Sequence, residues 1–60
     1  MLVELHDPQG QLFLVNTDDI GTVSWAPQGA TLNMVRTGKI SVQETFDTVI
    51  QILKNCANNV

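Results

Sequence analysis

The residues whose side chains could do chemistry are few and widely spaced. His6 lies next to Asp7 and is the only histidine, and Cys56 is the only cysteine. Nucleophilic catalysis needs a serine or cysteine placed against a base, and a structural zinc site needs several Cys or His ligands. Neither arrangement can be built from these residues. The sequence therefore predicts no catalytic residues, no metal site and no cofactor, and we expect the protein not to be an enzyme.

Three acidic residues are candidate ligands for a hard cation, namely Asp18, Asp19 and Glu44. Calcium takes many oxygen ligands, which its binding loops space closely along the chain. These three residues are not spaced in that way. We therefore expect them to be solvated carboxylates rather than a cation site.

The local concentration of positive charge is the segment Arg36, Thr37, Gly38 and Lys39. A hairpin tip with two cations and free main-chain N–H groups could hold a phosphate or a carboxylate. In an oligomer, tips from several chains would converge with Trp25 to clamp a nucleotide. The alternative, which the sequence favours, is a solvated turn that keeps the chain soluble.

Composition excludes some classes of partner. The net charge is −3, with only three basic residues. Duplex nucleic acid and anionic membranes are both bound largely through Lys and Arg, so neither is an expected partner. The N-terminus lacks the basic segment of a signal peptide, and no apolar run approaches the roughly 20 residues of a membrane span. We expect a soluble, cytoplasmic protein with no membrane insertion.

Turn residues divide residues 2–42 into short strands. Asp7-Pro8-Gln9-Gly10, Ala26-Pro27-Gln28-Gly29 and Thr37-Gly38 each suit a chain reversal, because Pro presets φ and Gly tolerates positive φ. The repeated Pro-Gln-Gly is thus interpreted as repeated turn chemistry rather than a ligand motif. Gly21 is expected to mark a bulge or bend in a strand.

The hydrophobic period changes after Val42. Phe46, Val49, Ile50 and Leu53 lie at i, i+3, i+4 and i+7, which predicts a helix over about 45–56 with a frayed tail at 57–60. We predict a single α+β domain over residues 1–60. It is an antiparallel β-meander of four to five short strands followed by one C-terminal helix packed on one sheet face.

Apolar residues exceed what so small a core can hold. They make up 43% of 60 residues, and the segment 12–15 (Leu-Phe-Leu-Val) is apolar on both faces of its strand, which implies cover on both sides. We predict that the protein associates with itself. The residues expected at an oligomer or partner interface are Phe13, Val15, Val23, Trp25, Val35 and Ile52. Two alternatives remain open: a monomer with a compact barrel-like core, and a Trp25 that packs against the helix.

The segments "LFLVNTDDI", "TLNMVRTGKISVQET" and "FDTVIQIL" resemble the FlbD-type family of small flagellar and swarming-motility proteins. The resemblance covers most of the chain. The matching positions are Gly10, Asn16, Asp18, Ile20, Thr31, Gly38, Val42, Glu44 and Thr45. It implies a fold of this kind and a non-enzymatic accessory role in motility. Similar small proteins are also carried by bacteriophages.

Two functional hypotheses follow. The first is a small homo-oligomeric binding module that modulates a larger protein complex, with a flagellar or motility role implied by the resemblance. The second is a phage-encoded inhibitor of a host defence system. Such an inhibitor would block a protein surface with acidic residues, or sequester a nucleotide messenger at a subunit interface.

Overall fold

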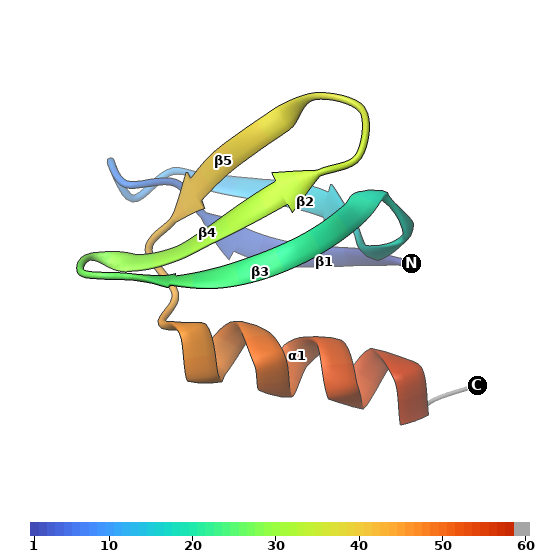
Figure 1. Ribbon diagram of the computed structural model, residues 1–60. Helices are drawn as coiled ribbons and strands as arrows, with labels where there is room; N and C mark the ends of the chain where they lie inside the picture. Colours follow the sequence, from blue (N-terminus) through green and yellow to red (C-terminus); the bar gives the residue numbers. More distant parts are fainter. Residues whose placement is uncertain (59–60) are drawn as a thin grey trace.

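The structure, a computed structural model, describes residues 1–58 and contains five short strands followed by one helix (Figure 1). The elements are β1 (Leu2–His6), β2 (Leu12–Asn16), the 3-10 turn η1 (Thr17–Asp19), β3 (Ile20–Ala26), β4 (Gly29–Met34), β5 (Gly38–Val42) and α1 (Phe46–Asn58). The predicted α+β fold of antiparallel strands and a C-terminal helix is confirmed.

The strands form two sheets rather than one. β1 and β2 make a two-stranded hairpin, and β3, β4 and β5 make a three-stranded sheet in sequence order, with every pair antiparallel. The two sheets are joined where the chain leaves β5, because the N–H of Gln43 donates to the carbonyl of His6 at the end of β1 (2.8 Å). The hairpin is thereby fixed against the larger sheet at one end.

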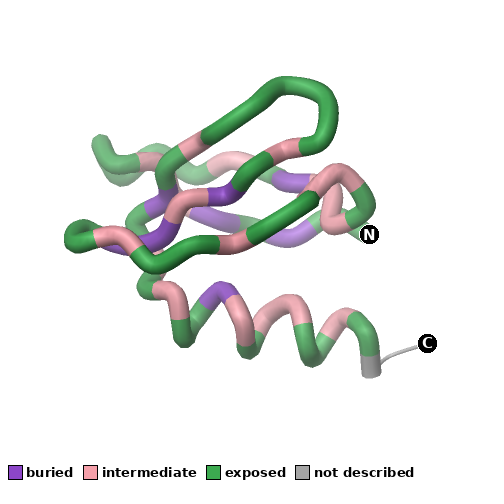
Figure 2. Tube along the Cα trace, viewed as in Figure 1, coloured by how far each residue is buried: buried purple, intermediate pink, exposed green. Residues whose placement is uncertain are grey.

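The core lies between the two sheets and is completed by α1 (Figure 2). Its buried side chains are Val3, Leu5, Val15, Ala30, Leu32, Val42 and Val49. In Figure 1 the hairpin lies behind the three-stranded sheet, and α1 runs beneath, next to β3. The helix therefore covers one open side of the two sheets, while the outer face of each sheet is left to solvent.

The helix is longer at its C-terminal end than the periodicity predicts. It begins at Phe46, where the main-chain N–H of Thr48 donates to the hydroxyl of Thr45 (3.2 Å), and it continues through Asn58. Two of the four residues expected in a frayed tail are thus helical, and residues 59 and 60 lie outside the described part of the chain. Within residues 1–58, no helix is both long and apolar enough to cross a membrane.

The two Pro-Gln-Gly segments are both turns. In the first, the N–H of Gly10 donates to the carbonyl of Asp7, and the Asp7 carboxylate accepts from the N–H groups of Gln9 and Gln11, all at 2.9 Å. In the second, the pairing of Ala26 with Gly29 leaves only two loop residues. Proline stands at the second position of each turn, where its fixed φ is favourable.

The bulge expected at Gly21 is present. The register between β3 and β4 shifts between Ile20 and Thr22, so Gly21 is the extra residue of β3. A side chain here would approach the carbonyl oxygen of Asn33 to 3.1 Å. Glycine thus allows β3 to bend close to β4 at this end of the strand.

Two glycines with positive φ provide a matched test of how closely the turn between β3 and β4 packs against Val42 and Gln43. At Gly29 (φ +153°) an added Cβ would lie 3.0 Å from the Gln43 carbonyl oxygen and closer still to that of Val42, whereas at Gly38 (φ +88°) nothing lies within 4 Å. We expect Gly29→Ala to lower the free energy of unfolding by about 3 kcal/mol, and Gly38→Ala by about 1 kcal/mol, because only the first adds overpacking to backbone strain. Urea denaturation measures both, and equal losses would contradict the packing described at Gly29.

Candidate interaction surfaces

The outer face of the β1–β2 hairpin carries three exposed leucines, and we call it the hairpin face. Leu2, Leu12 and Leu14 are 62%, 56% and 57% exposed. The register pairs Leu14 with Glu4 and Leu12 with His6, so these side chains share one side of the hairpin. The opposite side, with Val3, Leu5 and Val15, is buried. The hairpin face is therefore an apolar strip that contains the exposed carboxylate of Glu4.

A side-chain pair fixes the hairpin to the segment before α1. Glu44 accepts two hydrogen bonds from His6: Oε2 from the ring Nδ1–H (2.7 Å) and Oε1 from the main-chain N–H (2.9 Å). Burial raises the pKa of Glu44, but hydrogen bonds from the His6 ring, from the His6 N–H and from its own N–H lower the pKa by more. The pKa of Glu44 therefore lies below its ordinary value.

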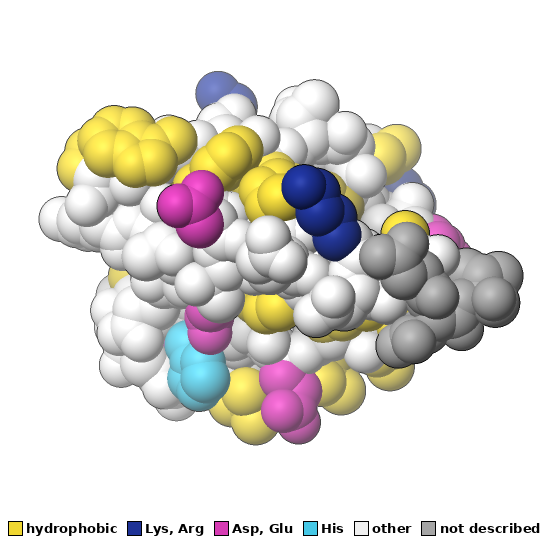
Figure 3. All heavy atoms as spheres, turned by 90° about the horizontal axis from the view of Figure 1, so that it is seen from below, with side chains coloured by type: hydrophobic (Ala, Val, Ile, Leu, Met, Phe, Trp, Pro, Cys, Tyr) yellow, Lys and Arg dark blue, Asp and Glu magenta, His cyan; other side chains and the backbone are white. Residues whose placement is uncertain are grey.

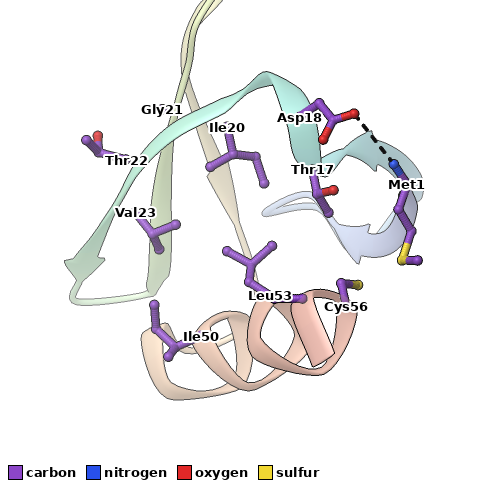
Figure 4. A pocket seen from close by; sticks show the side chains of 11 residues that line it. Met1, Thr17, Asp18, Ile20, Gly21, Thr22, Val23, Ile50, Leu53 and Cys56 are labelled. Carbon is purple, nitrogen blue, oxygen red and sulfur yellow. Dashed lines mark ion pairs between the residues drawn. The ribbon is translucent and has the colours of Figure 1, made fainter. Parts of the chain in front are cut away.

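A groove of about 530 Å³ lies between β3 and the C-terminal half of α1, and we call it the β3–α1 groove (Figure 4). The strand contributes Ile20 and Val23, whose side chains point toward Ile50 and Leu53 of the helix (Figure 4). Its volume is in the range of small-molecule and side-chain pockets. The groove is therefore a mainly apolar hollow with β3 as one wall.

The rim of this groove is polar at the end near the N-terminus. The terminal ammonium lies 4.0 Å from the carboxylate of Asp18 and donates to Asn16 Oδ1 (3.4 Å). Cys56 lines the same groove as a free, half-buried thiol.

In the space-filling view from below, hydrophobic side chains gather along two opposite margins of the molecule, on either side of the polar surface of the helix (Figure 3).

The six residues predicted for an interface do not lie on one surface. Trp25 is 70% exposed and stands at the end of β3, and Val35 is exposed in the β4–β5 loop. Val15 is only 3% exposed and belongs to the core, so in this fold it is covered by its own chain. The remaining three are half-buried against the core: Phe13, Val23 and Ile52.

Sequence reasoning did not select the three leucines of the hairpin face. The alternation in β2 left open whether Leu12 and Leu14 or Phe13 and Val15 point inward. A usable signal was present in the first strand, where Val3 and Leu5 flank the charged Glu4 and identify the inner side. The turn at 7–10 then sets the register that places Val15 opposite Val3.

The predicted anion-binding residues lie at the exposed β4–β5 turn and the start of β5, and the one arginine already has a partner. Arg36 donates to Asp19 Oδ2 at 2.7 Å, and this hydrogen bond, followed by the charge of Asp19, raises the pKa of Arg36 above its usual value. Gly38 has φ +88°, as the turn requires, and Thr37 and Lys39 are exposed. An anion at this loop would have to compete with Asp19 for the guanidinium group.

The three acidic residues have different partners in the fold, although Asp18 and Asp19 are neighbours in η1. Asp18 lies beside the N-terminus, Asp19 is paired with Arg36, and Glu44 is paired with His6. Among residues 1–58, no group of three or more His, Cys, Asp or Glu side chains could hold a metal ion.

Comparisons with models of known protein families, with curated proteins and with solved structures gave no match to this chain.

The depressed pKa of Glu44 makes a pH-dependent prediction. Glu44→Gln should lower the free energy of unfolding by about 1 kcal/mol at pH 7, because the charged acceptor of two hydrogen bonds is lost. A carboxyl whose folded pKa is lowered stabilises the fold above its unfolded pKa, about 4.3, and this contribution disappears as the pH falls through the lower folded value. The difference between wild type and variant should therefore shrink below about pH 4.

The matched control is Glu4→Gln, which alters an exposed carboxylate on the same strand as His6. Urea denaturation at several pH values compares the two variants. A pH-independent loss in Glu44→Gln, or an equal loss in Glu4→Gln, would contradict the role assigned to the His6–Glu44 pair.

Proposed function

We propose that the protein is a non-catalytic binding module that associates with itself and binds a larger protein complex. The observation that carries the proposal is that six large apolar side chains remain more than half exposed in a chain of this size: Met1, Leu2, Leu12, Leu14, Trp25 and Val35. Exposed apolar surface marks an interaction site where such side chains gather, as the three leucines do on the hairpin face.

The hairpin face suits a partner protein. It is an open sheet surface with three leucines around Glu4, so a partner with an apolar strip and a basic residue placed opposite Glu4 would satisfy both parts of it. The His6–Glu44 pair and the hydrogen bond from Gln43 to His6 hold the hairpin in place, so the face is presented on a fixed support.

The reactive groups give a catalytic role no comparable support. His6 is bound to Glu44 at the end of β1, and Cys56 lies at the other side of the core in the last turns of α1. Since the sequence resembles the FlbD-type family, we propose a flagellar or motility complex as the larger assembly that the hairpin face contacts.

Site-specific photocrosslinking in the cell tests the binding role. A photoreactive residue at Leu14, on the hairpin face, should give a discrete product whose mass is not a multiple of the mass of this chain. The same residue at Asn33, exposed on the outer face of the other sheet, should not. Leu12→Glu should abolish the Leu14 product, because burying an unpaired carboxylate against an apolar partner is unfavourable.

The identity of the crosslinked protein separates the candidate roles. A flagellar protein in the product would support the motility proposal, and a host-defence protein would instead support the inhibitor hypothesis. No product at Leu14, or equal products at Leu14 and Asn33, would show that the hairpin face does not bind a partner.

A further inference from the structure

We propose that two copies of the chain associate about a two-fold axis through β3 and α1, with Trp25 of each copy covering the β3–α1 groove of the other. This inference rests on the self-association proposed above and specifies its surface. The occupant of the groove is a second copy of this chain, and the argument is that the surface is complementary to itself in shape and in charge.

A projection and a hollow that fit each other in shape both lie along β3. Trp25, 70% exposed, is a projection near the end of β3, and the β3–α1 groove is a hollow that includes Gly21 of the same strand. Trp25 and Gly21 are four positions apart, or about 13 Å along the strand. In a two-fold interface each residue meets its counterpart in reverse order, so an antiparallel approach of two β3 strands centred on Val23 brings each Trp25 to the Gly21 end of the second copy's β3, where the groove lies.

β3 is free to be approached in this way. It is the outer strand of its sheet, with β4 on one side only. In the described part of the chain, no main-chain hydrogen bond joins residues 21–26 to any segment other than β4. Trp25 and Val23 pair across the ladder with Ala30 and Leu32, so both side chains are on the face of the sheet that holds the core and the helix.

The helix carries two opposite charges that can pair with those of a second copy. Asp47 and Lys54 are the only charged residues of α1 and both are exposed. They are seven residues apart, which places them on the same side of the helix about 10 Å from each other. Neither has an ion-pair partner within residues 1–58. Antiparallel helices related by a two-fold axis would place each Asp47 opposite Lys54 of the second copy, giving two ion pairs from one contact.

A single axis satisfies both arguments. Val23 is midway between Gly21 and Trp25 on the strand, and Ile50 is near the midpoint between Asp47 and Lys54 on the helix. Val23 and Ile50 both line the groove, and their side chains lie close together in Figure 4. The midpoint of the strand contact and the midpoint of the helix contact therefore lie next to each other, so one two-fold axis can pass through both.

A charge-exchange experiment tests the helix contacts. Asp47→Lys and Lys54→Asp should each weaken self-association by roughly tenfold at low ionic strength, because each variant alone brings like charges together. An equimolar mixture of the two variants should form a heterodimer about as well as wild type, since each helix then meets the opposite charge. The double variant D47K/K54D should self-associate again for the same reason. Sedimentation equilibrium from about 1 µM to about 1 mM measures all four samples.

A second series tests the indole. Trp25→Ala should raise the dimer dissociation constant by roughly 30-fold, the effect typical of a central tryptophan. The control is Leu14→Ala, which removes a similarly exposed apolar side chain from the hairpin face and should leave the dissociation constant unchanged. Since both side chains are mostly exposed in the single chain, circular dichroism should show that both variants remain folded.

Any of the following outcomes would overturn the inference. If the wild-type chain stays monomeric up to about 1 mM, both the β3–α1 interface and the self-association proposed above are wrong. The crosslink at Leu14 would still test the partner-binding role of the hairpin face independently. A wild-type dimer that the charge variants leave intact, or that fails to reform on mixing them, would place the contact elsewhere. If Leu14→Ala weakens the dimer as much as Trp25→Ala does, the copies meet through the hairpin face, and self-association survives while the β3–α1 interface does not.

Discussion

A single helix has to close a core that two small sheets leave open, and the rest of the surface depends on this constraint. Val49 is buried with Leu5 of the hairpin and Leu32 of the three-stranded sheet, so each of the three parts of the fold supplies one of the largest fully buried side chains. Residues 1–58 contain no second α-helix that could cover another side. The leucines of β2 and the indole of β3 therefore remain exposed even though the core itself is well filled.

The same arrangement separates two surfaces that a longer protein would cover with its own chain. The hairpin face is presented by β1 and β2, which are fastened at the His6 end by Gln43 and by the His6–Glu44 pair. The β3–α1 groove lies where the helix passes the outer strand of the other sheet. Because different elements form the two surfaces, self-association through one leaves the other accessible to a second protein. A module that assembles and binds at once needs this separation.

Much of the fold is predictable from the sequence because its signals are local. The turns at 7–10 and 26–29, the bulge at Gly21 and the apolar stripe from Phe46 to Leu53 each depend on residues within a few positions of one another. The division into two sheets does not, since it depends on contacts such as His6 with Glu44 and Asp19 with Arg36, which are 38 and 17 residues apart. The faces of β2 are a different case: alternation defines its two sides, and the inner side is identified by Val3 and Leu5 of β1 through the register that the turn at 7–10 sets.

The central claim is that the exposed apolar surface is covered when copies of the chain meet, and Trp25 offers the most direct measurement because it is the only tryptophan. Its fluorescence emission, recorded on the unmodified chain from about 1 µM to about 1 mM, should move to shorter wavelength as the indole passes from water into the groove of a second copy. Quenching by acrylamide should fall over the same range. An emission maximum that stays at the wavelength of a solvated indole at every concentration, with constant quenching, would contradict the account.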